Sequence, residues 1–549
     1  HATIAAWDGD KLTIYDSTQG VFGARGRVAQ AFEIDPANVR VVSYFIGGGF
    51  GCKGTTWSHA VLTAMAAKLA GKPVKLTLSR DQMFGPVGFR PKTIQQVTLG
   101  AASDGTLTAV RHDTTSQTSV FDEFVEPCSR TARMIYACPN CATSQKLVKV
   151  NAGTPTFMRA PGESSGSFAL ESAMDELAYA LKVDPIDLRI KNYADTDPDR
   201  NLPWSSKSLK ECYRQGAERF GWKGRNPAPG SMKKGDLLVG WGMATSTYPT
   251  NRSPATAKAI LYPDGTAVIQ AGTQDIGTGT YTVMTQVAAG ALGLPMNKVR
   301  FELGDTDFPE NPNSGGSQTA ASTGSGVHQA ASDLRDKAIA LAIADPNSPL
   351  RGHAATEISA GEGRIFLTAS PNTGESYADL LTRQKLSQLD ITSSSRPGDE
   401  RGQYSMHAFG AQFCEVTVDP DLYQVRVTRW VGCFGVGNLL NAKTARSQLM
   451  GGIVWGIGMG LVEETLTDPR YGRVLNADLA EYHVPVNADV PEIDVIFVPE
   501  DDPHVNPLGI KGIGEIGITG VAAAIANAVY HATGRRVRDL PVTLDKVMG

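Results

Sequence analysis

The sequence predicts an α+β protein with two domains that each mix helices and strands. The chain has 549 residues, which is more than one domain usually contains. Each half carries a strand, a glycine-rich loop and a helix in that order, but hairpins break the strict alternation of a doubly wound fold. A stretch rich in proline, glycine and lysine at 227–235 has the composition of a linker. We therefore predict domains at 1–226 and 227–549.

The elements of the first half follow from hydrophobic pattern and turn residues. An apolar, β-branched run at 39–46 predicts a strand, and a glycine-rich loop at 47–54 follows it. A helix is expected at 57–69 and a second strand at 74–79. The next segment, 93–112, predicts a hairpin instead of another strand and helix pair.

The first glycine loop leaves a dinucleotide-binding interpretation open. Gly49, Gly51 and Gly54 satisfy the GxGxxG pattern. Asp81 lies near the end of the following strand, where such a fold places the acid that binds ribose. A bulky Phe50 inside the turn is unlike the usual fingerprint, so an NAD-dependent Rossmann dehydrogenase is kept as an alternative.

A second punctuated loop, MRAPGE at 158–163, precedes an amphipathic helix expected at 167–181. Arg159 is a cation placed directly ahead of a helix that the pattern buries. From the residues alone, Arg159 pairs with a carboxylate, holds backbone carbonyls, or serves a ligand site.

The second half repeats the order of strands, glycine loop and helix. A hairpin is expected at 257–270, and the glycine loop 272–280 leads into a helix at 281–292 whose first N–H groups would favour an anion. Residues 313–326 are dense in hydroxyl groups and form either a flexible linker or a polar cradle for a phosphate-bearing ligand. The remaining expected elements are a polar loop at 393–403, a two-stranded meander at 409–430 and a helix at 448–461.

One carboxylate, Glu515, stands alone among glycines and apolar residues in the stretch 509–517. A helix of small residues is expected at 518–533, with Gly534 as its C-terminal cap. Apolar neighbours raise the pKa of a carboxylate because they remove water from it, and a raised pKa suits a general base. The alternative is an acid in the first helical turn that the helix dipole favours.

Composition and charge exclude several classes of partner. The chain is 41% hydrophobic and 20% charged, which is ordinary for a globular protein. A net charge of −4 gives no reason to expect a nucleic-acid or anionic membrane partner. We find no apolar run of transmembrane length and expect no membrane span. The compartment stays open between the cytoplasm and, for export with a partner subunit, the periplasm.

The seven cysteines predict neither a disulfide framework nor a metal cluster. Their odd number argues against complete pairing. Cys138 and Cys141 have CxxC spacing, but no second pair follows at a zinc or iron–sulfur distance.

Several motifs occur together in an order typical of one family. They are GGGFGCK at 47–53, MRAPG around Arg159, QDIGTGT at 274–280, TAAS with Ser322, and GIKGIGEIG around Glu515. Over essentially its whole length the chain resembles the molybdenum-binding subunit of the xanthine oxidase family, most closely the aldehyde-oxidising, three-subunit bacterial members. The resemblance implies two elongated mixed α/β domains with the molybdenum cofactor held between them.

The resemblance also implies roles for individual residues. Glu515 would act as the base, Arg159 would orient the substrate or the developing oxyanion, and the backbone at Phe50 and Gly51 would face the metal's oxo ligand. The pterin dithiolene would hold molybdenum, so no protein side chain is expected to bind the metal. The implied cofactor-binding residues are Gly49, Phe50, Gly51, Arg159, Gln274, Asp275, Gly277, Thr278, Gly279, Ser322, Thr323, Lys511, Gly512 and Gly514.

The implied activity is oxidation of an aldehyde to a carboxylic acid, with water as the oxygen source. Purine-oxidising members have a glutamate where this chain has Gly54. That difference favours an aldehyde and leaves an N-heterocycle or xanthine-type hydroxylase as the alternative. Trp455 stands where many relatives have glutamine, which puts one cofactor contact in doubt.

The implied cofactor is the molybdenum–molybdopterin cytosine dinucleotide, or plain molybdopterin. Electrons would leave through a partner subunit with a [2Fe–2S] cluster and then a subunit with FAD. We also expect an N-terminal part of the first domain to be missing before His1, including a glutamine that relatives place near the metal. A cofactor-free fragment is therefore a further alternative.

Overall fold

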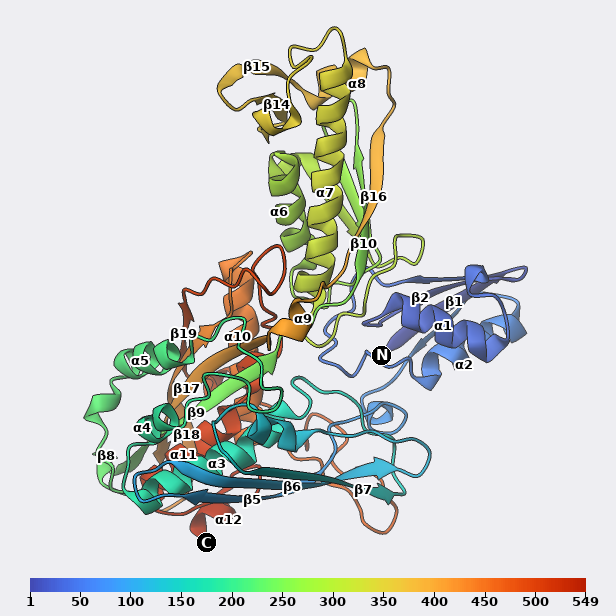
Figure 1. Ribbon diagram of the computed structural model, residues 1–549. Coiled ribbons are helices and arrows are strands. Elements are labelled where there is room, and N and C mark those ends of the chain that lie inside the picture. Colours follow the sequence, from blue (N-terminus) through green and yellow to red (C-terminus); the bar gives the residue numbers. More distant parts are fainter.

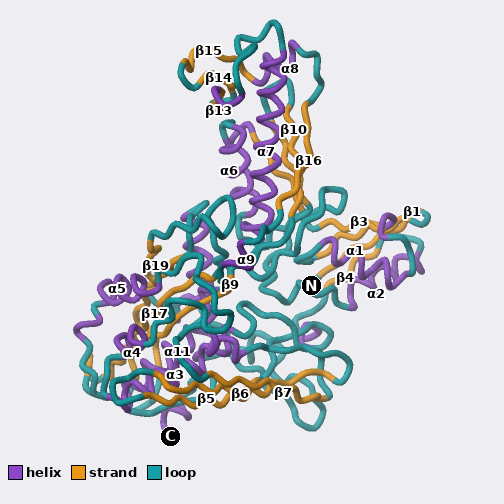
Figure 2. The backbone as a smooth tube through the Cα atoms, in the orientation of Figure 1, coloured by secondary structure: helices purple, strands orange, loops and turns teal.

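The computed structural model describes residues 1–549 and shows a wide body that carries a narrow arm (Figure 1). Five sheets build the molecule. Three of them lie in the wide part together with their helices, and the arm rises from it (Figure 2). Helices and strands are mixed throughout, as the sequence predicts.

A small four-stranded sheet of order β3-β2-β1-β4 contains the first glycine loop. Strands β3 and β4 lie at opposite edges, separated by β2 and β1, whereas a dinucleotide-binding unit needs them as neighbours. The Rossmann interpretation is therefore wrong for this segment. The elements are β1 (Ala2–Asp8), β2 (Lys11–Asp16), α1 (Val21–Phe32), β3 (Val39–Val42), α2 (Ser58–Ala70) and β4 (Val74–Thr77).

The expected hairpin at 93–112 is confirmed as β5 (Thr93–Ala101) and β6 (Leu107–Ser119), which pair antiparallel. Strand β7 (Cys141–Val150) adds to this sheet in parallel. Helix α3 (Glu163–Leu181) packs on β5 and begins four residues before the expected start at 167. Two further helices follow, α4 (Pro185–Lys191) and α5 (Leu209–Phe220).

A five-stranded sheet of order β19-β18-β17-β9-β8 forms the centre of the body. The meander expected at 409–430 is confirmed by the antiparallel pair β17 and β18. Helix α11, which ends at Gly534 as expected, packs on β9 and β17, and α10 packs on α11. The elements are β8 (Met232–Lys234), β9 (Leu237–Pro249), β17 (His407–Val418), β18 (Val425–Gly435), α10 (Ala442–Leu461), β19 (Glu492–Val498), α11 (Val521–Thr533) and α12 (Leu544–Met548).

The arm consists of a sheet of order β12-β11-β10-β16, two helices packed on each other and a small sheet at the tip (Figure 1). The hairpin expected at 257–270 is confirmed by the antiparallel pair β10 and β11. The elements are β10 (Ala255–Leu261), β11 (Ala267–Ala271), α6 (Thr280–Leu292), β12 (Val299–Leu303), α7 (Thr319–Ala344), β13 (Ile358–Gly361), β14 (Arg364–Leu367), β15 (Ser370–Ser376), α8 (Tyr377–Arg383), β16 (Leu389–Ser395) and α9 (Glu400–Gln403).

Two expected loops differ in the structure. Only 313–318 of the polar stretch 313–326 is a loop, because the rest forms the start of the 26-residue helix α7. The small residues there allow α7 to pack closely, as at Gly326, where an added Cβ would lie 3.0 Å from the Ala255 carbonyl oxygen. Similarly, the polar loop expected at 393–403 is partly strand β16 and helix α9.

The apolar core forms four clusters, of which the largest fills the arm and the second lies around α10 and α11. A third cluster joins residues from both sides of position 226, among them Leu209, Met243 and Phe409. The boundary between 1–226 and 227–549 stays a prediction.

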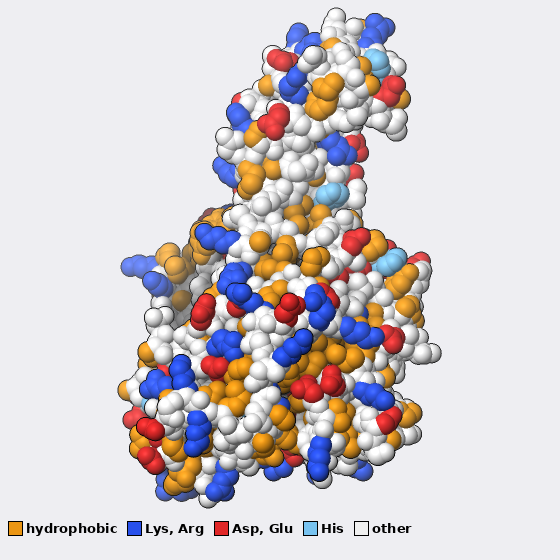
Figure 3. Space-filling view, turned by 90° about the vertical axis from the view of Figure 1, so that its left-hand side faces the viewer, with side chains coloured by type: hydrophobic (Ala, Val, Ile, Leu, Met, Phe, Trp, Pro, Cys, Tyr) orange, Lys and Arg blue, Asp and Glu red, His pale blue; other side chains and the backbone are white.

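Two further features concern the surface charge and one apolar helical stretch. Positive and negative side chains are interspersed over the face in Figure 3. The stretch Ile516–Thr533 is long and apolar enough to cross a membrane by length and composition alone, a length that the sequence analysis assigned to no run. Because 89% of this stretch is buried inside the protein, we interpret it as a core helix.

Candidate active site

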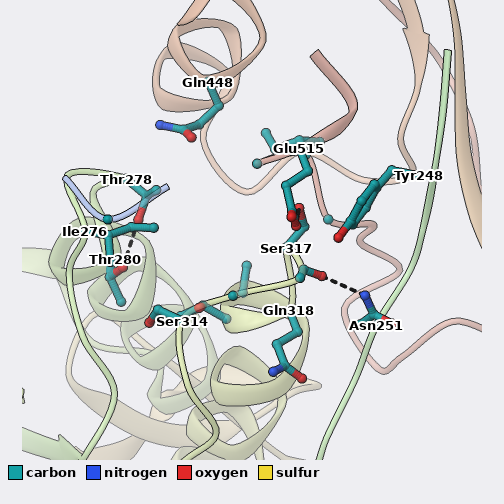
Figure 4. Close-up of a pocket in the computed structure, with 18 of the residues that line it drawn as sticks. Tyr248, Asn251, Ile276, Thr278, Thr280, Ser314, Ser317, Gln318, Gln448 and Glu515 are labelled. Carbon is teal, nitrogen blue, oxygen red and sulfur yellow. Dashed lines mark hydrogen bonds between the residues drawn. The ribbon is translucent and has the colours of Figure 1, made fainter. Parts of the chain in front are cut away.

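A cavity of about 590 Å³ lies where loops from the arm, from the centre of the body and from the four-stranded sheet β3-β2-β1-β4 meet. Its wall includes the first glycine loop, the MRAPG loop, the loop before α6, the loop before α7 and the loop that carries Glu515. Figure 4 shows that the side chains of Tyr248, Ser317 and Glu515 converge in this cavity. The motifs found in the sequence are therefore brought together in space.

The first glycine loop is held by a side chain that the sequence analysis missed. Gln19 is buried, and its Oε1 accepts hydrogen bonds from the backbone N–H groups of Gly51 (2.9 Å) and Lys53 (3.2 Å). Its Nε2 donates to the Ser314 carbonyl at 2.6 Å. One amide thus joins the loop of the small sheet to the loop before α7. The glutamine expected before His1 is a separate residue and stays a prediction.

The first glycine loop also lies directly against the MRAPG loop. A Cβ added at Gly51 would overlap the carbonyl of Phe157, so only glycine permits this approach. The backbone N–H of Arg159 donates to the Phe50 carbonyl at 2.9 Å. These contacts place Gly49, Phe50 and Gly51 on the cavity wall, as the resemblance implies.

Arg159 lines the cavity and at the same time holds two loops. Its Nε donates to the Gly514 carbonyl at 2.6 Å and one terminal nitrogen donates to the Gln448 carbonyl at 2.7 Å. Burial lowers the pKa of Arg159 to about 10, and the carboxylate of Glu515 opposes that change. The arginine is therefore a carbonyl clamp, with its remaining donor capacity left for the cavity.

Glu515 is the only carboxylate on the cavity wall. It lies before a short 3-10 turn, Ile516–Ile518, and five residues separate it from the start of α11 at Val521. The alternative of an acid in the first turn of that helix is therefore wrong. Ser317 Oγ donates to Glu515 Oε2 at 2.8 Å, and the backbone N–H of Ala160 donates to Oε1 at 3.3 Å.

The surroundings of Glu515 set its protonation. Burial raises the pKa of the carboxyl group, and hydrogen bonds from Ser317, Tyr248 and the Ala160 backbone lower it in part. Tyr248 comes from the end of β9 and points its hydroxyl group toward this carboxylate (Figure 4). The raised pKa agrees with the environment expected of a general base.

Three residues around this carboxylate have left-handed backbone conformations although they are not glycine. They are Phe50 (φ 56°), Ala160 (φ 55°) and Ser317 (φ 55°). A non-glycine residue in this region costs about 1–2 kcal/mol, and such strain gathers at functional sites. Two of the three, Ala160 and Ser317, donate hydrogen bonds to Glu515, so the fold accepts strain there to place donors around the carboxylate.

The glycine loop before α6 contributes in two different ways. Gly277 and Thr278 line the cavity. Asp275 does not line it, because its Oδ1 accepts the N–H groups of Gly277 (2.8 Å) and Thr278 (3.1 Å) and so shapes the loop. Gln274 is buried behind the wall, where Ser314 Oγ donates to it at 3.2 Å. Gly279 has a φ of 81° and caps α6.

Besides Gln274 and Asp275, three further implied cofactor-binding side chains point elsewhere. Ser322 and Thr323 are buried inside α7, where Ser322 Oγ accepts the Ser253 N–H at 2.9 Å and Thr323 Oγ1 donates to Asn311 Oδ1 at 3.0 Å. The Lys511 ammonium is fully buried against Glu500 at 2.5 Å. Lys511 therefore reaches the wall through its backbone, beside Gly512 and Gly514, which also line the cavity.

Further polar side chains on the wall belong to no family motif, and those outside 313–326 were missed by the sequence analysis. Asn251 and Gln318 appear in Figure 4 beside Ser317, and Gln448 lies on the opposite side. Arg252 and Arg401 also line the cavity, and neither forms a salt bridge with a carboxylate. The sequence analysis offered 313–326 as a flexible linker or a polar cradle for a ligand, and residues 313–318 of this stretch line the cavity.

The wall offers no protein ligand set for a metal ion. No histidine or cysteine lines the cavity, and no group of three or more His, Cys, Asp or Glu side chains could hold a metal anywhere in the chain. Cys138 and Cys141 are free thiols. Backbone groups, amides and hydroxyls dominate the polar part of the wall. This wall suits a metal that a pterin holds.

Comparison with known proteins shows that the chain is similar to proteins that bind a molybdopterin cofactor. Two family models, both described as molybdopterin cofactor-binding domain, match residues 1–193 and 215–491. The chain is 38% identical over 549 residues to the aldehyde oxidoreductase molybdenum-binding subunit PaoC of Escherichia coli (strain K12), covering 100% of this chain and 73% of that protein. It is 32% identical to the putative xanthine dehydrogenase molybdenum-binding subunit XdhA of the same organism, covering 98% and 73%.

Solved structures show the same fold. Quinoline 2-oxidoreductase from Pseudomonas putida 86 matches with a TM-score of 0.91 at 21% identity, covering 100% of this chain and 73% of that one. Fold and site together define a molybdopterin-binding oxidoreductase chain, which confirms the expected fold class. The chain belongs to the molybdenum-binding subunits of the xanthine oxidase family, whose members are molybdenum-dependent oxidoreductases.

Proposed function

We propose that this chain is the catalytic subunit of a molybdenum hydroxylase that oxidises aldehydes to carboxylic acids with water as the oxygen source. Relatives named aldehyde oxidoreductase support the substrate class; besides PaoC they include the enzyme of Megalodesulfovibrio gigas, at 27% identity. A relative named for xanthine dehydrogenase supports the wider chemistry.

The observation that carries the aldehyde assignment is the single carboxylate of the cavity. A purine substrate needs a second acidic partner, which the resemblance places at position 54. Gly54 lines the cavity here, and no other wall residue than Glu515 supplies a carboxylate. An aldehyde needs fewer polar contacts than a purine, because only its carbonyl carbon and oxygen must be positioned.

In the proposed mechanism, one residue of the chain accepts a proton and the others orient that residue or the substrate. The molybdenum cofactor supplies the two-electron oxidation. Glu515, with its raised pKa, accepts the proton that the attacking oxygen releases. Ser317 and the Ala160 N–H fix the two carboxylate oxygens, so the base is oriented before substrate enters. Arg159 holds the Gly514 carbonyl beside the base and offers its remaining N–H groups to an oxyanion.

We assign the cytosine dinucleotide form of the cofactor to this cavity. Arg252 and Arg401 lack salt-bridge partners, and Arg252 Nε is buried without any hydrogen-bond partner. Guanidinium groups bind phosphate oxygens in fixed geometry, so two such groups suit the diphosphate of a dinucleotide. Acid hydrolysis of the purified holoprotein should release CMP in a one-to-one ratio with molybdenum. Molybdenum without any nucleotide would identify plain molybdopterin.

The proposed electron path leaves the chain. No cysteine group of this chain could hold an iron–sulfur cluster. A partner subunit with a [2Fe–2S] cluster would therefore accept the electrons, and an FAD subunit would pass them on. Co-purification of the native complex followed by iron and flavin analysis tests this assignment.

Replacing the base tests the proposed mechanism. The Glu515→Gln variant should keep its molybdenum content and lose about 10²- to 10⁴-fold in turnover of an aldehyde, because the amide cannot accept the proton. Steady-state kinetics with benzaldehyde and metal analysis of the same sample measure both quantities.

A matched control separates catalysis from burial. Glu463 is also a partly buried carboxyl group whose pKa is raised mainly by burial, but it does not line the cavity. Glu463→Gln should leave turnover within about twofold of the wild type. If Glu515→Gln kept its turnover as well, Glu515 would not be the base.

A further inference from the structure

Two aromatic side chains at the cavity wall are exposed, and each is supported in the same way. Phe50 and Phe157 both line the cavity and are 54% and 53% exposed. Phe50 lies edge-to-face against Trp455, with ring centres 5.3 Å apart and planes at 86°. Phe157 lies against Phe124 at 5.2 Å and 85°. We call Phe50 and Phe157 the aromatic rim.

The two rings of the aromatic rim share one braced piece of backbone. Gly51, next to Phe50, packs on the Phe157 carbonyl without room for a side chain. The Arg159 N–H donates to the Phe50 carbonyl at 2.9 Å. The position of the Phe50 ring therefore depends on its side-chain torsions and on what supports the ring.

Trp455 supplies that support from outside the cavity. It lies on α10, packs partly buried against the second core cluster, and is not part of the cavity wall. The Phe50 ring also lies against Gly48, where an added Cβ would be 2.8 Å from Phe50 Cε2. The ring is thus confined between a glycine and an anchored tryptophan. A glutamine at 455, which the family resemblance leads us to expect, could not make the edge-to-face contact.

We propose that Trp455 is a positioning residue that fixes the Phe50 ring, so that the aromatic rim can contact the body of an aromatic aldehyde. This inference rests on the proposed function and deepens it. An exposed ring held in one orientation costs little conformational entropy when a flat, apolar substrate packs on it. A small aliphatic aldehyde has no body to reach the rim and gains nothing from it.

Kinetics with two aldehydes test the proposal. Trp455→Leu should raise the KM for benzaldehyde about three- to tenfold, the range that one aromatic pair contributes. The kcat should stay within about twofold, and so should the KM for acetaldehyde, because Trp455 touches neither the base nor the carbonyl. Trp455→Phe keeps an aromatic edge at this position and should restore most of the benzaldehyde KM.

Equilibrium binding gives a readout without turnover. Benzoate, the product formed from benzaldehyde, should bind the Trp455→Leu holoenzyme with a Kd raised by the same factor, as measured by calorimetry. Trp7→Leu is the matched control, because Trp7 makes a similar pair with Phe32 at 5.3 Å and neither residue lines the cavity. That variant should change neither KM nor Kd.

The outcomes separate this proposal from the proposed function. Equal KM changes for both aldehydes, or an unchanged benzoate Kd, would overturn the role of Trp455. A wild-type enzyme that oxidises no aldehyde would overturn the proposed function, while its benzoate Kd would still report on the rim. If Trp455→Leu did not fold, Trp455→Met, which keeps more of the volume, should show the same selective loss.

Discussion

At the scale of one residue, the proposed role of Glu515 as the base predicts an activity that depends on pH. Burial raises the pKa of Glu515 above the ordinary value of 4.5, and only the ionised carboxylate can accept a proton, so activity falls as pH falls through the raised value. Ser317 favours the ionised form through its 2.8 Å hydrogen bond. In Ser317→Ala, the acid limb of kcat/KM should therefore move to higher pH, with the plateau reduced by less than about tenfold.

A pH profile of kcat/KM from pH 4 to 9 measures this change. Ser325→Ala is a suitable control, because Ser325 is buried in α7 and donates only to the Ala321 carbonyl. Its profile should match the wild type. An acid limb that does not move in Ser317→Ala would show that Ser317 orients the base without tuning its pKa.

Single residues were predictable from sequence only where a motif marks them. Glu515 and Arg159 stand out because a charge sits among glycines or ahead of a buried helix. Gln19 reaches the same cavity from the short loop between β2 and α1, and Tyr248 from the end of strand β9, so nothing local distinguishes them. Conversely, Ser322 belongs to a motif but is buried inside a helix, where it supports the site from behind.

At the scale of elements, the packing of α11 on β9 depends on two strand glycines. Added Cβ atoms at Gly240 and Gly242 would overlap the backbone of α11 at Ala528 and Ala524, which cannot move as a side-chain end can. Gly242→Ala should therefore lower the free energy of unfolding by at least about 1–3 kcal/mol, the usual cost of overpacking.

Denaturant unfolding of the variant measures that loss, and a second glycine provides the control. Gly290 lies in α6 with no atom within 4 Å of an added Cβ. Gly290→Ala should raise the free energy of unfolding by about 0.5–1 kcal/mol, because alanine is the better helix former. If both variants changed stability alike, helix propensity and backbone entropy would outweigh the contact with α11.

Element prediction succeeded where hydrophobic period was strong and failed where residues were small. The hairpins β5–β6 and β10–β11 and the helix α2 lie within a few residues of their expected positions. The first turns of α7 were interpreted as a loop, because serine, threonine and glycine have low helix propensity. Burial overrides that propensity here, since 13 residues of α7 are buried.

At the scale of the whole molecule, the cavity is built from loops of several different parts of the chain. Its wall takes loops from the arm, the body and the small sheet. A ligand that binds only the folded state stabilises it by about 2.7 kcal/mol at a concentration one hundred times its Kd. Cofactor-depleted protein should therefore melt at a lower temperature than the loaded protein, as scanning calorimetry would show. Equal melting temperatures would mean that the cofactor does not bind the folded state in preference to the unfolded state.

The left-handed backbone at Ala160 and Ser317 lowers thermal stability, while Ser317 supports the proposed activity. Glycine would relieve the backbone at Ala160 and at Ser317, by about 1–2 kcal/mol each. At Ser317 the same change would remove the hydroxyl group that holds the base. A laboratory selection for thermal stability alone would thus favour glycine at 317 and give up turnover. Thermal stability and turnover should therefore change in opposite directions when Ser317 is replaced by glycine.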